Sequence, residues 1–295
     1  MNINKKHFSI GIVTPVKNEE DTLQNLANCI LSQTRLPDHW LIVDDGSSDT
    51  TPSIINSLKK KYNWITSISL PDRGYYSRGE GSYSTAAKGF KYMLASFDVQ
   101  VLGIFDADIS FEKTTIERIR DAFLKSNKLG IYGGEIVELI DGKWITPMIL
   151  PKDFVRGACK FFRRQCYEDI GGIKLGKSSN VISNMEALMY GWEVKRDSTL
   201  LIKHLRSGGS RDNYVQRYTK GGVEAAYIGS DSLLTLVRGV RKMIKSKPYF
   251  LGGLIFLGTY FNKAFLRRDQ YSNPKLLKFI QKRHRQILWE GFYRW

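Results

Sequence analysis

The first 140 residues alternate between short apolar runs and stretches in which apolar residues recur every three or four positions. Apolar, β-branched runs of this length are typical of strands buried on both faces of a sheet, and the wider spacing is typical of amphipathic helices. The pattern predicts strands at 9–14, 40–43, 64–70, 101–105 and 130–137, and helices at 21–33, 52–61, 82–97 and 114–126. This alternation predicts an α/β fold with a mostly parallel sheet and helices on both faces.

Polar side chains follow four of the predicted strands at the points where those strands end. The four segments are 14–19, 44–47, 72–73 and 106–108. In open α/β sheets, ligands bind beyond the carboxyl ends of the strands. An Asp-Gly-Ser turn or an Asp-x-Asp cap has a purely structural explanation when it stands alone. Four polar segments at one predicted edge instead indicate a binding site.

Asp106 and Asp108 stand one residue apart, directly after a predicted buried strand. Magnesium and manganese bind a few carboxylate oxygens together with water and substrate phosphates. A cation held there would bridge a diphosphate and stabilise it as a leaving group. Asp44 or Asp45 follows a neighbouring predicted strand and is placed to accept a hydrogen bond from a base or a ribose. The residues therefore predict a nucleotide-diphosphate site.

Three motifs, in this order, resemble those of family 2 glycosyltransferases of the GT-A fold. They are Thr14-Pro15-Val16-Lys17-Asn18-Glu19-Glu20, Asp44-Asp45-Gly46-Ser47-Ser48-Asp49 and Asp106-Ala107-Asp108-Ile109-Ser110. Later segments resemble one subgroup, which includes bacterial transferases of polysaccharide and lipid-linked sugar assembly. Those segments are 171–172 (GG), 191–192 (GW), 203–209 (KHLRSGG) and 218–260. The resemblance covers essentially the whole chain.

The resemblance implies a Rossmann-like nucleotide-diphospho-sugar transferase fold and an inverting reaction. It also implies a nucleotide-sugar donor, with UDP-sugars preferred, and a divalent metal, Mn²⁺ or Mg²⁺. The acceptor would be a hydroxyl of a lipid-linked or polysaccharide glycan at the cytoplasmic face of the membrane.

Motif by motif, the resemblance assigns residues to the donor. The base pocket would be lined by Thr14, Val16 and Glu19. Asp44 or Asp45 would contact uracil or ribose, and Arg78, in the glycine-rich loop 73–84, would contact the diphosphate. The full donor-binding set is Thr14, Pro15, Val16, Glu19, Asp44, Asp45, Asp72, Arg78, Asp106, Ala107 and Asp108.

The metal set implied by the resemblance contains three residues. Asp106 and Asp108 form the Asp-x-Asp pair, with Asp108 the more direct ligand. His204 would fall where the family has a histidine, near the end of the catalytic domain, that approaches the metal and the diphosphate. A lone histidine is often structural, and that alternative stays open.

One position departs from the family pattern and leaves the catalytic base open. Inverting transfer needs a base that takes the proton from the acceptor hydroxyl. The family supplies an aspartate about 11 residues before the Gly-Trp pair, and that count reaches Asn180, which cannot act as a base. Glu186 lies six residues later on the same predicted helix (180–190), but not on the same face. The alternatives are Glu186 after a shift in register, another carboxylate such as Asp153 or Glu135, or a slow or inactive protein.

Positive charge is concentrated near the C-terminus. The chain has 295 residues and a formal net charge of +16, and residues 236–295 hold 14 Lys/Arg against two acids. Residues 248–261 are uncharged but too short to span a bilayer comfortably. Residues 276–288 are amphipathic with a basic face, and aromatic residues follow them. These features predict attachment to an anionic membrane surface through 236–295. Packing of 248–261 against the catalytic domain or in a homodimer is the alternative.

We expect two domains. A catalytic domain would cover 1–215, with a donor half of about 1–110 and an acceptor half of about 111–215, and a helical membrane-associating extension would cover 216–295. Three cysteines without CxxC spacing favour a reducing compartment, and no signal-peptide pattern is visible. The expected location is cytoplasmic, peripheral on the inner face of the cell membrane.

Two other classes of function compete with the enzyme. Asn180 motivates a transferase-like protein that binds nucleotide or glycan without catalysis. The charge alone motivates a nucleic-acid binder, but the sequence lacks an RRM, KH or helix-turn-helix signature. We therefore expect no nucleic-acid partner. With 42% hydrophobic and 25% charged residues, the composition excludes a disordered or low-complexity chain.

Overall fold

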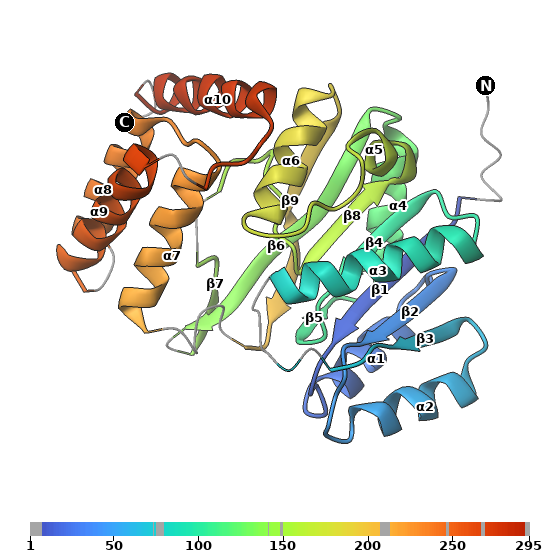
Figure 1. Cartoon of the computed structure of the whole chain (residues 1–295). Coiled ribbons are helices and arrows are strands. Elements are labelled where there is room, and N and C mark those ends of the chain that lie inside the picture. The colour runs from blue at the N-terminus through green and yellow to red at the C-terminus, as the bar shows by residue number, and fades with distance from the viewer. Residues whose placement is uncertain are drawn as a thin grey trace. The chain divides into compact units, whose positions relative to one another are not determined.

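A computed structural model describes residues 8–72, 74, 80–140, 142–147, 150–206, 213–245, 248–266 and 269–292. The chain divides into two compact units, Met1–Gly208 and Gly209–Trp295, which Figure 1 colours from blue to yellow and from orange to red. We refer to them as the N-terminal unit and the C-terminal unit.

The N-terminal unit contains a nine-stranded sheet. Its strands are β1 (Ile10–Val16), β2 (His39–Asp44), β3 (Ile65–Ser69), β4 (Val101–Phe105), β5 (Ile109–Phe111), β6 (Leu129–Ile140), β7 (Lys143–Ile145), β8 (Cys159–Arg163) and β9 (Glu193–His204). The order is β3-β2-β1-β4-β8-β6-β9-β5, with β7 paired to β6. The β3-β2-β1-β4 half is entirely parallel, as predicted. In the other half β6 and β9 are parallel, while β8 lies antiparallel between β4 and β6 and β5 lies antiparallel to β9.

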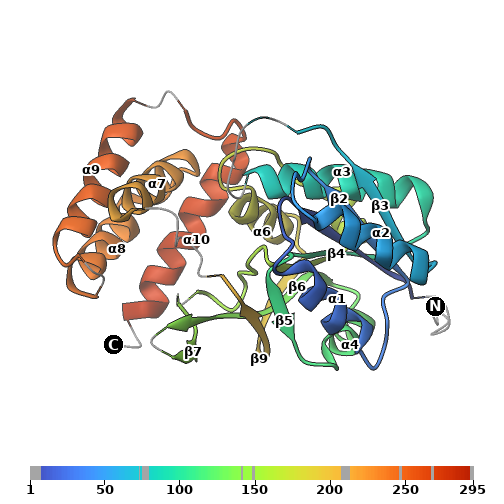
Figure 2. The same cartoon turned by 90° about the horizontal axis from the view of Figure 1, so that it is seen from below.

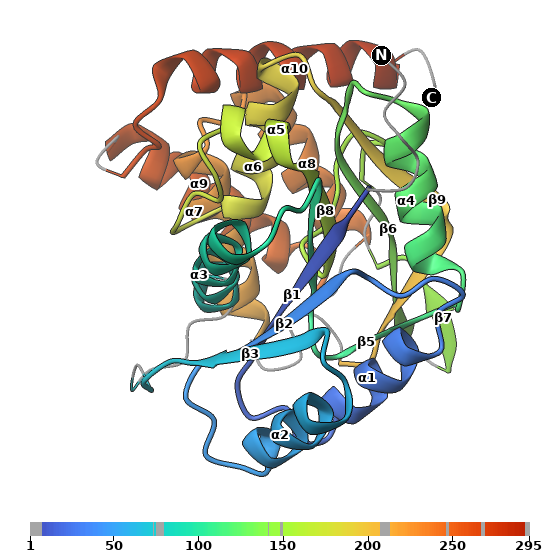
Figure 3. The same cartoon turned by 90° about the vertical axis from the view of Figure 1, so that its right-hand side faces the viewer.

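Helices cover both faces of this sheet. They are α1 (Leu23–Leu31), α2 (Thr51–Lys61), α3 (Glu80–Ser96), α4 (Thr115–Lys125), α5 (Arg164–Asp169) and α6 (Ser179–Met189). One core lies between the sheet and α1, α2 and α4, and it includes Leu26, Ile55 and Phe123. The other lies under α3, α5 and α6 and includes Phe90 and Ala187. Figure 3 shows the two helical layers on opposite sides of the strands. The predicted α/β architecture is confirmed.

The parallel strands bring the predicted polar segments to one edge. Val16 is in register with Asp44, and β4 lies on the other side of β1 in the same direction. Gly46, just after β2, has φ 76°, and a Cβ there would lie 2.5 Å from the Cα of Asp72. Glycine is needed at this position because it alone combines that φ with so close a backbone neighbour. The segments after β2 and β3 therefore pack directly on each other.

The C-terminal unit is helical. It contains α7 (Tyr214–Tyr227), α8 (Ser232–Lys245), α9 (Leu251–Leu266) and α10 (Pro274–Phe292), coloured orange to red in Figure 2. Asn213 and Gln216 form a capping box at the start of α7. Tyr218, Phe256 and Tyr260 form a small core between α7 and α9. Within the part of the chain that the structure describes, no helix is both long and apolar enough to cross a membrane.

The contact between β4 and β8 gives a test of the packing. A Cβ on Gly103 would lie 2.1 Å from Cε1 of Phe161, whose ring is fully buried and packs edge-on against Phe105 at a centroid distance of 5.2 Å. Because this ring has no room to move, Gly103→Ala should destabilise the N-terminal unit by about 1–3 kcal/mol. The measurement is the midpoint of urea unfolding. Gly258→Ala in α9, where no atom lies within 4 Å of the new Cβ, is the control and should not lower it. An unchanged midpoint for Gly103→Ala would contradict the described packing.

Candidate donor and metal site

Asp106, Asp108 and His204 lie together at the end of β4. Asp106 follows β4 directly, and Asp108 immediately precedes β5. The antiparallel pairing of β5 with β9 places Ile109 opposite His204, which is the last residue of β9. One ligand atom from each of the three side chains lies within 4.8 Å of the others. Two segments almost 100 residues apart in the sequence thus meet through the sheet.

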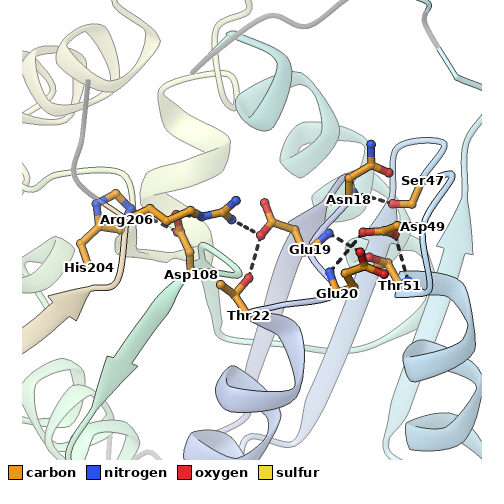
Figure 4. Close-up of polar contacts among 10 residues, drawn as sticks. All are labelled: Asn18, Glu19, Glu20, Thr22, Ser47, Asp49, Thr51, Asp108, His204 and Arg206. Carbon is orange, nitrogen blue, oxygen red and sulfur yellow. Dashed lines mark hydrogen bonds and ion pairs between the residues drawn. The ribbon is translucent and has the colours of Figure 1, made fainter. Parts of the chain in front are cut away.

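Arg206 connects this group to the first motif. Its Nε donates to Asp108 Oδ2 at 3.1 Å, and its guanidinium also forms an ion pair with Glu19. Thr22 Oγ1 donates to the same Glu19 carboxylate at 2.7 Å. Figure 4 shows the resulting row of His204, Asp108, Arg206, Glu19 and Thr22. No role was predicted for Arg206, although a basic residue two positions after the candidate histidine was a usable signal.

Charge interactions set the pKa values in this group. Burial and the neighbouring charge of Asp108 raise the pKa of Asp106 to about 6. Burial would also raise the pKa of Asp108, but the hydrogen bond from His204 and the charges of His204 and Arg206 outweigh it and lower the pKa. Burial lowers the pKa of His204, but Asp108 and Asp106 more than compensate and raise it. The site therefore favours a positive charge between the two carboxylates.

The donor set fits a divalent cation. Carboxylate oxygens are the ligands that manganese and magnesium prefer, and the imidazole adds a nitrogen ligand that transition metals accept. His204 Nδ1 is buried and has no hydrogen-bond partner among the described residues. His204 Nε2 lies 3.1 Å from Asp108 Oδ1, so the ring is already oriented by a carboxylate. The assignment of these three residues as metal ligands remains a prediction.

Hydrogen bonds tie the first and second motifs together. The Asn18 amide, in a left-handed conformation with φ 55°, donates to Ser47 Oγ at 2.9 Å. The Glu19 amide donates to Thr51 Oγ1 at 2.8 Å, and the Glu20 amide donates to Asp49 at 3.2 Å. Figure 4 shows this second cluster beside Glu19. Backbone donors of one motif thus fix the loop of the other.

The remaining predicted donor residues differ in how they are placed. Thr14 is fully buried, and its hydroxyl accepts from Trp40 Nε1 at 3.0 Å. Asp44 is also buried and accepts from the Ser47 amide at 2.9 Å, whereas Asp72 is exposed and pairs with Lys17. Four further residues of the set are buried at the strand ends: Pro15, Val16, Asp45 and Ala107. Arg78 lies outside the described residues.

The two candidate catalytic residues lie on α6 in different surroundings. Asn180 is partly exposed, and its Oδ1 accepts from the Tyr83 hydroxyl at 2.9 Å and from Lys160 Nζ at 3.0 Å. Glu186 is buried, with Oε2 4.0 Å from Lys174 Nζ. No role was predicted from the sequence for Tyr83 or Lys160. Lys160 interrupts an apolar run, which was the only signal in the sequence.

The comparisons identify the family. Residues 11–175 match Glycosyl transferase family 2, and since this is more than half of the chain, the protein belongs to that family. A beta-monoglucosyldiacylglycerol synthase from Synechocystis sp. is 28% identical over 113 residues, which is 37% of this chain and 22% of that protein. The minor teichoic acid biosynthesis protein GgaA from Bacillus subtilis is 25% identical over 124 residues, which is 41% of this chain and 26% of that protein. The alignments thus cover about a quarter of each relative.

Solved structures show the same fold. The mannosyltransferase PcManGT from Pyrobaculum calidifontis, in complex with GDP-Man and Mn²⁺, matches 92% of this chain and 72% of its own at 15% identity and a TM-score of 0.53. Residues 1–349 of S. aureus TarS, in complex with UDP-GlcNAc, match 88% of this chain and 73% of their own at 13% identity and a TM-score of 0.53. The predicted GT-A fold is confirmed.

The raised pKa of Asp106 makes stability depend on pH. Its pKa is about 6 in the folded chain and 3.8 in the unfolded chain, so the folded chain retains a proton that the unfolded chain releases. The contribution of this bound proton to the free energy of unfolding is fully present below about pH 4 and is lost as the pH rises through 6. Asp106→Asn should therefore stabilise the metal-free protein by up to roughly 3 kcal/mol at pH 8 and by about half as much at pH 5, with little effect near pH 3.5. The measurement is thermal unfolding in EDTA.

Asp98→Asn is the matched control, because the Asp98 side chain is 84% exposed and pairs with Arg164. It should show no gain at pH 8. A loss of stability for Asp106→Asn at pH 8 would contradict the assigned electrostatics.

Proposed function

We propose that the chain is an inverting, metal-dependent glycosyltransferase that takes a sugar from a nucleotide-diphosphate sugar, with UDP-sugars preferred. The observation that carries this proposal is the meeting of Asp106, Asp108 and His204 within 4.8 Å, at the strand edge that also holds Glu19. Membership of Glycosyl transferase family 2 supports the reaction class. The solved structures with GDP-Man or UDP-GlcNAc support a nucleotide-sugar donor.

Asp106, Asp108 and His204 would hold the metal, Mn²⁺ or Mg²⁺. A divalent ion at this position supplies positive charge that stabilises a departing diphosphate. The chain itself fixes Asp108 through His204 and Arg206, and fixes Glu19 through Arg206 and Thr22. These contacts hold the carboxylates in place before any ligand arrives, which lowers the cost of ordering them on binding.

The acceptor is proposed as a lipid-linked or polysaccharide glycan. Support comes from the names of two relatives, a synthase of monoglucosyldiacylglycerol and a protein of teichoic acid biosynthesis. We assign catalysis to a domain over 1–215 and keep Asn180 and Glu186 as the candidate catalytic residues. The competing proposal, a transferase-like protein that binds without catalysis, rests on Asn180.

Replacement of a metal ligand tests the proposal. Asp108→Asn should lower metal-dependent hydrolysis or transfer of the donor by at least about 100-fold, because it removes a carboxylate charge that would hold the metal ion. The measurement is nucleoside diphosphate release from a panel of UDP- and GDP-sugars with Mn²⁺, Mg²⁺ or EDTA. Circular dichroism should show an unchanged fold. Absence of turnover by the wild-type protein on every donor, or full activity of Asp108→Asn, would contradict the proposal.

We also propose that residues 236–295 attach the protein to the anionic inner face of the cell membrane. On α8, the side chains of Leu233, Leu236, Val237, Val240 and Ile244 form one stripe at helical spacing, and all are exposed, Ile244 to 67%. On α9, another exposed apolar stripe consists of Leu251, Leu254, Phe261 and Phe265. Exposed apolar stripes beside many basic residues suit a helix lying in a lipid headgroup layer. A homodimer that buries these stripes is the alternative.

Vesicle flotation tests the attachment. Wild-type protein should float with vesicles that contain phosphatidylglycerol and less with purely zwitterionic vesicles, because lysine and arginine are attracted to anionic headgroups. Val240→Asp with Ile244→Asp should lower the bound fraction at least about fivefold. Leu36→Asp, at an exposed apolar residue of the N-terminal unit, is the control and should not. Equal flotation of the double variant would contradict the lipid contact, and a shift of its mass from dimer to monomer would favour the homodimer.

A further inference from the structure

The C-terminal unit contains a cavity that plays no part in the proposed glycosyl transfer. Its volume is about 1270 Å³, and its walls come from the end of α7, the turn into α8, and residues of α8, α9 and α10. All of the lining residues belong to this unit. Sites for small molecules are commonly cavities of about 300–1000 Å³, so this one has room for a sizeable ligand.

The lining of the cavity is amphipathic. Large apolar side chains of α8 and α10 form part of it: Leu233, Leu277, Leu288 and Trp289. Lys278 and Arg285 add basic groups to the same lining. A smaller cavity of about 360 Å³ shares these two residues and Trp289, and Lys282 lines it as well. The apolar cavity therefore adjoins a basic cluster, which consists of Lys278, Lys282 and Arg285.

Among the described residues, one acid lines these cavities, and its carboxylate is already engaged. Asp231 accepts from the Leu233 and Leu234 amides at 3.0 and 3.2 Å, which caps the start of α8. The same carboxylate forms an ion pair with Arg285 at 3.0 Å. The two lysines of the basic cluster are exposed, and no carboxylate among the described residues pairs with them. The cluster thus has a surplus of positive charge that favours an anionic ligand.

A buried hydroxyl in the cavity wall adds a hydrogen-bond donor. Ser230 is 4% exposed, and its Oγ has no hydrogen-bond partner among the described residues. The turn that carries it is fixed, because the Ser230 carbonyl accepts from the Tyr260 hydroxyl at 2.7 Å. A buried polar group without a partner is costly, and a ligand oxygen in the cavity, such as an ester carbonyl, would accept from this hydroxyl.

The surroundings of the cavity point to a lipid as its ligand. Leu233 belongs both to the cavity lining and to the exposed apolar stripe on α8, and Trp289 is 68% exposed. We propose that the cavity holds an acyl chain of one anionic phospholipid, with the phosphate at the basic cluster. The chain matches the apolar walls, the ester carbonyl matches Ser230, and the phosphate matches the lysine and arginine side chains.

This site goes beyond the proposed membrane attachment. The attachment rests on apolar stripes of α8 and α9 that lie in a headgroup layer, whereas here a single lipid molecule is held between helices of the unit. The site therefore binds its ligand in the absence of a bilayer, and it does not depend on glycosyl transfer.

Monomeric short-chain lipids test the site without a membrane. Dihexanoyl phosphatidylglycerol and dihexanoyl phosphatidylcholine carry the same chains but differ in charge. In calorimetric titrations of the full chain, below the concentrations at which these lipids form micelles, the first should bind at least about tenfold more tightly. Dioctanoyl phosphatidylglycerol should bind at least about fivefold more tightly still, because more CH₂ groups are buried.

Three results of these titrations overturn the inference. They are equal affinities for the two headgroups, no dependence on chain length, and binding of glycerol 3-phosphate as tightly as phosphatidylglycerol. The last result would indicate a soluble phosphate as the ligand.

Variants of the lining test the residues. Lys278→Gln should lower the affinity for phosphatidylglycerol about fivefold and leave that for phosphatidylcholine unchanged. Lys275→Gln makes the same change at an exposed residue of α10 that lines neither cavity, and as the matched control it should change neither affinity. Ala264→Phe, on the α9 wall, should fill part of the cavity and lower both affinities at least about tenfold, with an unchanged circular dichroism spectrum. Unchanged affinity for phosphatidylglycerol in Lys278→Gln and Ala264→Phe overturns the inference.

Vesicle flotation separates this inference from the proposed attachment. Binding of monomeric phosphatidylglycerol without flotation would support the cavity site and contradict the attachment. Flotation without binding of any monomeric lipid would overturn the cavity site alone.

Discussion

The burial of two aspartates next to each other is the constraint on which the rest of the site depends. Asp106 and Asp108 stand one residue apart between β4 and β5, and burial together with the charge of Asp108 raises the pKa of Asp106 to about 6. Of the two aspartates, Asp108 is the one that accepts hydrogen bonds from Arg206 and His204 among the described residues, so the ionised state is stabilised more on Asp108 than on Asp106. Two neighbouring ionised carboxylates repel each other, and a cation held between them would remove that repulsion, so the proposed metal binding would also stabilise this edge of the sheet.

The parallel half of the sheet was predictable from the sequence, whereas in the mixed half only β6 was predicted, as the strand at 130–137. β1 and β4 are continuous apolar runs followed by motif residues, so both the strand and the site at its end could be predicted. β8 was missed because Lys160 interrupts its apolar run, and β9 because its burial pattern is irregular over twelve residues. Arg206 and Lys160 act through contacts with segments 98 and 20 residues away, and no local pattern encodes such pairings.

The two units differ in how completely they bury their apolar side chains. In the N-terminal unit, the apolar side chains of the central strands are buried, among them Trp40 on β2 and Phe161 on β8. In the C-terminal unit, α8 keeps Leu234 buried while the side chains of Leu233 and Ile244 are 57% and 67% exposed. The sequence shows that the basic residues are concentrated in this unit, but only the three-dimensional arrangement shows which apolar side chains are exposed.

The residue at position 180 also fits the charges already present. A carboxylate there would add a further negative charge beside Tyr83, whose pKa is raised by burial and by the charge of Asp106. The neutral amide of Asn180 avoids that repulsion, and its oxygen accepts from the Tyr83 hydroxyl at 2.9 Å and from Lys160 Nζ at 3.0 Å.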